Sequence, residues 1–188
     1  MTKLGEFLRA QRSSRLKGAC ADQRGMAAVE FALILPFMLL LYLGSVELTQ
    51  GIIVDRDVAM TADTVTNIVA QYTTLSASQQ LPDILNASAQ IFSPNPSSAA
   101  TVVVSLITID GSGNATVTWS QALNGTPLTK GQSITIPSNL DIANTTLVFG
   151  QATYAYTPWF DYLGIGTLTL SSQVYMSPRA SSTINLVS

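Results

Sequence analysis

Residues 24–43 read RGMAAVEFALILPFMLLLYL, and this stretch decides the fold. From Met26 to Leu43 it runs for 18 residues, of which only Glu30 is charged. At 1.5 Å per residue, a helix of this length extends roughly 27 Å, which is close to the thickness of the hydrocarbon core of a bilayer. We therefore expect residues 26–43 to form a membrane-spanning helix, with Pro36 as either a kink or a tolerated transmembrane proline.

Glu30 is the unusual residue of this stretch. A charged side chain inside a membrane helix costs about 2.5–3.5 kcal/mol on insertion scales, so its presence calls for a function and a partner. Gly25, which stands five residues before it, suggests that partner. If the chain is cut after Gly25, Met26 gains a positive amine and Glu30 becomes the fifth residue. The alternative is an acid tolerated near a helix end.

The helical pattern continues beyond the apolar stretch as far as Tyr72. Apolar residues recur there at spacings of three and four, and charged residues occupy the positions between them, which is typical of an amphipathic helix. We therefore predict one long helix over residues 26–72, transmembrane over 26–43 and amphipathic after. The charged residues on its polar positions are Glu47, Asp55, Arg56, Asp57 and Asp63.

The charges are distributed very unevenly along the chain. Only 11% of the residues are charged and the net charge is −2, so a clustered basic face for nucleic acid is not expected. The segment before Gly25 nevertheless has six basic residues and two acids, and the rest of the chain has three basic residues and nine acids. A basic flank directly before an apolar span places the N-terminus in the cytoplasm. Residues 1–25 are thus interpreted as a basic cytoplasmic leader, either cleaved or retained.

The residue types needed for catalysis or metal binding are scarce. The chain has no histidine, and its single cysteine, Cys20, lies in the leader. The carboxylates of Asp110, Asp141 and Asp161 are too scattered to suggest a paired acid and base. We therefore expect no catalytic residues, no metal site and no cofactor.

After Tyr72 the composition changes, and residues 73–188 are predicted to form a β-rich head outside the cytoplasm. A short helix is expected over residues 78–92, followed by a loop rich in proline and serine. Strands joined by short polar turns favour an antiparallel sheet, with the long helix covering one face. The predicted strands are 101–110, 115–120, 133–136, 145–156 and 167–176, the first two forming a hairpin.

Aromatic residues gather near the end of the fourth predicted strand. Two interpretations are open for this cluster. It forms either an adhesive or subunit-contact patch, since Tyr and Trp are favoured at interfaces, or ordinary core packing where a strand meets a turn. The cluster consists of Tyr154, Tyr156, Trp159, Phe160 and Tyr162.

The N-terminal motif resembles that of TadE/TadF-like minor pseudopilins, which belong to the tight-adherence (Tad, Flp) branch of type IV pili. The resemblance rests on Arg24-Gly25, on Val29-Glu30-Phe31 and on the apolar run with a proline that follows. The end of the chain, Val174 to Arg179, is also similar to the final strand and Pro-Arg ending of such proteins. The same N-terminal pattern begins the larger TadG-type proteins, and residues 73–170 match no family pattern.

The resemblance implies a pilin-like α+β fold and a non-enzymatic role in pilus assembly and adhesion. A prepilin peptidase would cut on the cytoplasmic side between Gly25 and Met26. Glu30 would then meet the amine of Met26, in its own chain or in a neighbour, so that Glu30 and Phe31 set the register of assembly. The implied partners are this peptidase, other pilin or pseudopilin subunits, the assembly platform and membrane lipid. The implied location is the inner (cytoplasmic) membrane, crossed once, with the head outside.

Two rival interpretations come from other classes of protein. One is a signal-anchored envelope protein whose head binds a ligand or scaffold without any filament, although such an anchor has no need of Glu30. The other is a secreted protein released by signal peptidase near Gly44. An apolar region of 18 residues exceeds the usual signal-peptide core, and no clean cleavage site stands there.

Overall fold

The computed structural model describes residues 23–160, 164 and 166–188. Residues 1–22 of the predicted leader, including Cys20, lie outside these ranges, as do Asp161 and Tyr162. The chain divides into two compact units after Val46. The architecture is α+β, with one long helix followed by an antiparallel sheet, as predicted.

Helix α2 spans Gln23–Val69 and combines the apolar run and the amphipathic stretch in a single element. Helical structure continues through Pro36. It ends three residues before the predicted boundary at Tyr72, because the backbone tightens there: the N–H groups of Gln71 and Tyr72 donate to carbonyls only three residues back. The prediction of one long helix is confirmed.

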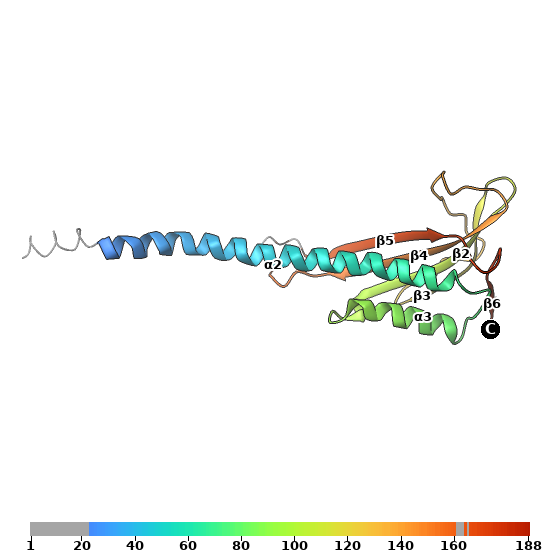
Figure 1. The fold of residues 1–188 in the computed structure, drawn as a ribbon, viewed down its shortest axis with the longest axis horizontal. Helices are drawn as coiled ribbons and strands as arrows, with labels where there is room; N and C mark the ends of the chain where they lie inside the picture. The colour runs from blue at the N-terminus through green and yellow to red at the C-terminus, as the bar shows by residue number, and fades with distance from the viewer. Residues whose placement is uncertain (1–22, 161–163, 165) are drawn as a thin grey trace, which may run out of the picture. The chain divides into compact units, whose positions relative to one another are not determined.

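The main sheet has four strands in the order β3-β2-β4-β5, and every neighbouring pair is antiparallel (Figure 1). Each strand follows a predicted one to within a few residues. The strands are β2 (Ala100–Ile109), β3 (Ala115–Leu123), β4 (Thr145–Tyr156) and β5 (Leu168–Met176).

One face of the sheet is covered by helices. The part of α2 after Glu47 lies along this face, with α3 (Gln80–Ala89) beside it (Figure 1). A 3₁₀ turn, η1 (Gln90–Phe92), completes the helix predicted over residues 78–92, and η2 (Ser97–Ala99) precedes β2. The core on this face joins α2 to alternate residues of the strands, as the period of two in a strand requires. Its α2 members are Val54, Val58, Ala62, Val65 and Val69.

The opposite face of the sheet is partly covered by the connection between β3 and β4. Leu128, Ile134, Ile136 and Leu140 of this connection pack against a small buried cluster that includes Phe149. The predicted strand at 133–136 is wrong, because only the isolated bridge between Thr116 and Ser133 forms there. Ile134 and Ile136 alternate as in a strand, but they serve to cover the sheet.

A second, two-stranded sheet was not predicted. Strand β1 (Thr74–Ser76) pairs in parallel with β6 (Asn185–Val187), and Leu75 lies opposite Leu186. The amide of Arg179 also donates to the carbonyl of Ala70, at 2.8 Å. These contacts attach the C-terminal residues to the chain that directly follows α2. Strands of three residues are too short to produce a recognisable alternation.

Candidate assembly helix and its junction with the head

The first half of α2 presents apolar side chains on all its sides. Among the described residues, α2 is the one helix that is long and apolar enough to cross a membrane, with a mean hydropathy of 2.2 over its most apolar window. None of that window is buried in the chain. A helix that is apolar all round requires lipid or other helices around it. Its exposed side chains include Met26, Val29, Phe31, Leu33, Phe37, Leu41 and Tyr42.

The predicted processing and register residues all lie on this part of α2. Met26 and Glu30 are four residues apart, so they lie on the same side of the helix, about 6 Å apart along its axis. Glu30 and Phe31 are both exposed. A Cβ built on Gly25 meets no atom within 4 Å. The described fold therefore gives no steric reason for a glycine at position 25.

Glu47 joins α2 to the end of strand β4. Its Oε2 accepts a hydrogen bond from the hydroxyl of Tyr156 at 3.2 Å, and its Oε1 accepts one from the backbone N–H of Phe160 at 3.0 Å. Burial raises the pKa of Tyr156, and the negative charge of Glu47 and the hydrogen bond to it raise it further. We call these two contacts of one carboxylate the Glu47 clasp.

The sequence alone placed Glu47 on the polar side of the helix and assigned it no function. One signal could have drawn attention to it. Glu47 is the first charged residue after Glu30, so it marks the end of the uncharged run. Its partners, more than 100 residues further along the chain, could be recognised only from the folded structure.

The aromatic cluster divides into buried and exposed members. Tyr154 and Tyr156 are buried, and Tyr154 stacks on Phe92 with 4.9 Å between ring centroids. Core packing is therefore confirmed for these two. The interpretation as core packing is wrong for Trp159, whose side chain is 86% exposed. The Phe160 side chain is 42% exposed. Tyr162 lies outside the described residues.

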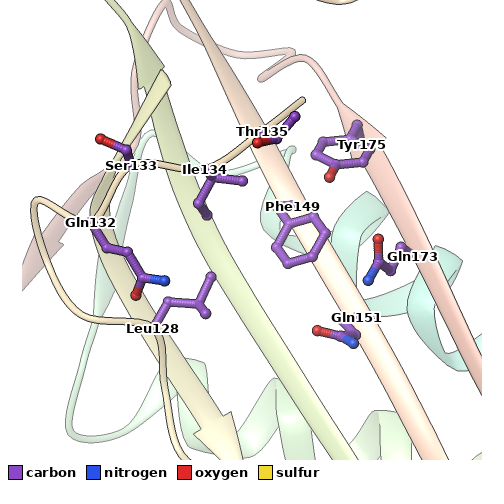
Figure 2. Close-up of a pocket in the computed structure, with 9 residues that line it drawn as sticks. All are labelled: Leu128, Gln132, Ser133, Ile134, Thr135, Phe149, Gln151, Gln173 and Tyr175. Atoms are coloured by element: carbon purple, nitrogen blue, oxygen red, sulfur yellow. The ribbon is translucent and has the colours of Figure 1, made fainter. Parts of the chain in front are cut away.

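A hollow of about 330 Å³ lies on the sheet face opposite the helices. Figure 2 shows Phe149, Gln151, Gln173 and Tyr175 rising from β4 and β5, with the connection between β3 and β4 on the other side. None of the lining residues has a carboxylate, an amine or a thiol. The hollow offers amide and hydroxyl groups beside aromatic rings, which suits contact with a neutral polar partner. The remaining lining residues are Leu128, Gln132, Ser133, Ile134 and Thr135.

Of the three scattered aspartates Asp110, Asp141 and Asp161, the last lies outside the described residues. Asp110 is engaged in its own hairpin turn, where its side chain accepts hydrogen bonds from the amides of Ser112 and Asn114 at 2.8 and 2.9 Å. The Asn114 side chain donates a third, and it is the largest cause of a lowered pKa for Asp110. Over the ranges that the structure describes, no group of three or more His, Cys, Asp or Glu residues is placed to hold a metal.

An apolar helix that ends in an α+β head defines a membrane-anchored protein with a single span. Comparison with protein families narrows this class: the model of the family described as TadE-like protein matches residues 25–66. The resemblance in the N-terminal motif is thereby confirmed, and it associates the chain with the Tad pilus and its other components. The match begins at Gly25 and ends inside α2, so it includes none of the sheet. No curated protein and no solved structure matches the chain.

Proposed function

We propose that this protein is a non-enzymatic minor pseudopilin of the Tad pilus, processed by a prepilin peptidase after Gly25. The observation that carries the proposal is the position of Glu30. It is the single charge in the exposed apolar stretch 26–43 of α2, four residues after the residue that would become the N-terminus, within the segment that matches the TadE-like family. Residues 1–25 would be the leader, 26–72 the assembly helix and 73–188 the head on the far side of the inner membrane.

The mechanism follows from the cost of burying charge. In a bilayer, or among other apolar helices, the Glu30 carboxylate is stable only with a cationic partner. The Met26 amine of the same chain or of a neighbour supplies that partner. Where the partner is the amine of a neighbour, subunits docked out of register would leave both charges unpaired, so the pair selects one axial position for the helix. Phe31 would pack beside the pair.

Processing would also explain the glycine at position 25. Glycine disfavours a helix by about 1 kcal/mol relative to alanine, and nothing in the described fold requires it at this site. A peptidase that recognises the bond after Gly25 would supply the requirement.

The first test is the N-terminus of the protein isolated from its native membrane, measured by mass spectrometry. A start at Met26 is expected. An intact Met1 would overturn the processing step and favour the rival envelope anchor, for which the hollow beside Phe149 and Tyr175 would be a ligand site. A start beyond Leu43 would mean a released head.

Two variants with matched controls extend this test. Gly25→Ala should abolish processing, whereas Gly44→Ala, at the other α2 glycine whose Cβ meets nothing within 4 Å, should leave it intact. Glu30→Gln should be processed but fail to assemble into pili. Asp55→Asn, which removes an exposed acid further along the same helix, should assemble normally. Normal piliation with Glu30→Gln would refute the register role.

A further inference from the structure

Trp159 has the largest exposed fraction of the described large apolar side chains, at 86%. The other tryptophan, Trp119, is a core residue with 7% exposure, and its indole N–H donates to the carbonyl of Ile184 at 2.8 Å. Exposing a whole indole ring to water forfeits the burial that such a large apolar group normally provides. A solvent-exposed tryptophan therefore calls for a partner of its own.

The position of Trp159 is determined by the Glu47 clasp. The residue directly after it, Phe160, donates its backbone N–H to Glu47, and Tyr156 before it donates its hydroxyl to the same carboxylate. Trp159 is thus flanked by two residues that contact the same carboxylate of α2, Tyr156 through its hydroxyl and Phe160 through its backbone N–H.

Glu47 follows the last residue of the predicted span, Leu43, by only four residues, so the length of the chain keeps it near the end of that span. If residues 26–43 occupy the hydrocarbon core, Glu47 and the attached Trp159 are at the depth of the lipid headgroups. Tryptophan is enriched at that depth, because its ring is apolar and its N–H needs a polar partner. Each oxygen of the Glu47 carboxylate already accepts a hydrogen bond, which reduces the cost of placing it near lipid.

We propose that Trp159, together with Phe160, is an interfacial anchor that inserts into the headgroup region of the bilayer crossed by α2. The occupant of this surface is lipid. The anchor would fix the membrane-proximal end of the head at the bilayer surface before assembly. This proposal rests on the membrane span of the proposed function and not on cleavage after Gly25.

The test uses the fluorescence of the full chain in lipid nanodiscs, quenched either by brominated phosphatidylcholine or by acrylamide in the water. Wild-type protein should be quenched strongly by the brominated lipid, and Trp159→Ala should lose most of that quenching. The residual signal comes from Trp119, which is buried in the core and serves as the internal baseline.

A relocated tryptophan provides the matched control. Ile142 is also exposed, at 61%, and it precedes β4, whereas Trp159 follows that strand. The double variant Trp159→Ala/Ile142→Trp therefore places an exposed indole at the opposite end of a 12-residue strand. Its fluorescence should respond to acrylamide and not to brominated lipid. Glu47→Ala should make Trp159 more accessible to acrylamide, because the clasp is lost.

Equal lipid quenching of wild-type protein and Trp159→Ala would overturn the proposal. A second outcome would also overturn the proposal: brominated lipid does not quench Trp159, and the ring is protected from acrylamide only when many copies share a disc. That outcome would assign the ring to a contact with a neighbouring subunit. Extraction with alkaline carbonate shows separately whether α2 is integral to the membrane. A carbonate-resistant protein with an unquenched Trp159 would refute the anchor and leave the proposed function standing.

Discussion

Thr66 on helix α2 occupies the space that a side chain on Gly150 would need. The Thr66 hydroxyl donates to the carbonyl of Ala62 at 2.6 Å and lies directly over the glycine in the middle of β4. A Cβ on Gly150 would overlap this hydroxyl and would approach the carbonyl oxygen of Ala62 to 3.1 Å. Turning the Thr66 side chain could relieve the overlap with its hydroxyl, but the close approach to Ala62 would remain, because that oxygen belongs to the helix backbone. Helix and sheet therefore lie in close contact at this pair.

Gly150→Ala should therefore destabilise the head. Forcing a methyl group into a tight core costs about 1–3 kcal/mol. The change should appear as a lower midpoint in thermal unfolding followed by circular dichroism in detergent. Gly51→Ala is the control, because its new Cβ would stand 3.8 Å from the Tyr156 ring and alanine favours the helix. Thr66→Ala should recover part of the Gly150→Ala loss, and full additivity of the two changes would contradict direct contact.

Removing the charge of Glu47 should lower the pKa of Tyr156 toward its ordinary value of 10.0, because one cause of the raised pKa is lost. Burial of the hydroxyl remains, so the pKa should stay above 10.0. A raised pKa in the folded state contributes stability that is complete below pH 10.0 and is lost as the pH rises through the folded pKa. In Glu47→Gln this loss should be smaller and should end at a lower pH, because it still begins at the unfolded pKa of 10.0 but the folded pKa is less raised. Ultraviolet titration of tyrosinate measures the shift, with Tyr156→Phe identifying the signal. An unchanged titration would show that the clasp does not form in solution.

The hairpin turn held by Asp110 should weaken in acid. Hydrogen bonds from the Asn114 side chain, and then from backbone amides, lower the pKa of Asp110 below 3.8. The stability from this carboxylate is present above pH 3.8 and is lost as the pH falls through the folded pKa. Asp110→Asn should remove this part of the acid dependence of thermal unfolding.

Two isoleucines provide a test of the C-terminal packing. Ile184 is 1% exposed and belongs to the core that contains Trp119, so Ile184→Ala should cost about 2–5 kcal/mol in denaturant unfolding. Ile142→Ala, at an exposed position, should change stability by less than about 0.5 kcal/mol. Similar values for the two variants would mean that residues after β5 contribute little to the fold.

The predictable parts of this fold are those with strong local patterns. The period of the apolar residues in α2 predicts its ends to within three residues, and the alternation in β2 and β4 predicts these strands to within one. The same alternation at Ile134 and Ile136 is misleading. A segment that packs over a sheet can place apolar side chains at every second residue, just as a strand of the sheet does. Parallel pairing of β1 with β6 depends on contacts between distant segments, which no local pattern contains.

The candidate site was predictable to a similar extent. Gly25 and Glu30 stand out from sequence because a charge and a glycine are unusual in and beside an apolar run. Glu47 has no such contrast, since it begins an amphipathic stretch where acids are common. The role of Glu47 depends on Tyr156 and Phe160, which the fold brings to it from the end of β4.

The pairing of β1 with β6 has a consequence for how the head folds as the chain is synthesised. The paired residues are roughly 110 positions apart, so the strand that follows α2 has no partner until the far end of the chain has been delivered. Leu75 and Trp119 remain incompletely packed until that moment, because Leu186 and Ile184 complete their surroundings. A chain that still lacks residues 184–187 therefore leaves this part of the core open. Arrival of residues 184–187 turns it into a closed head.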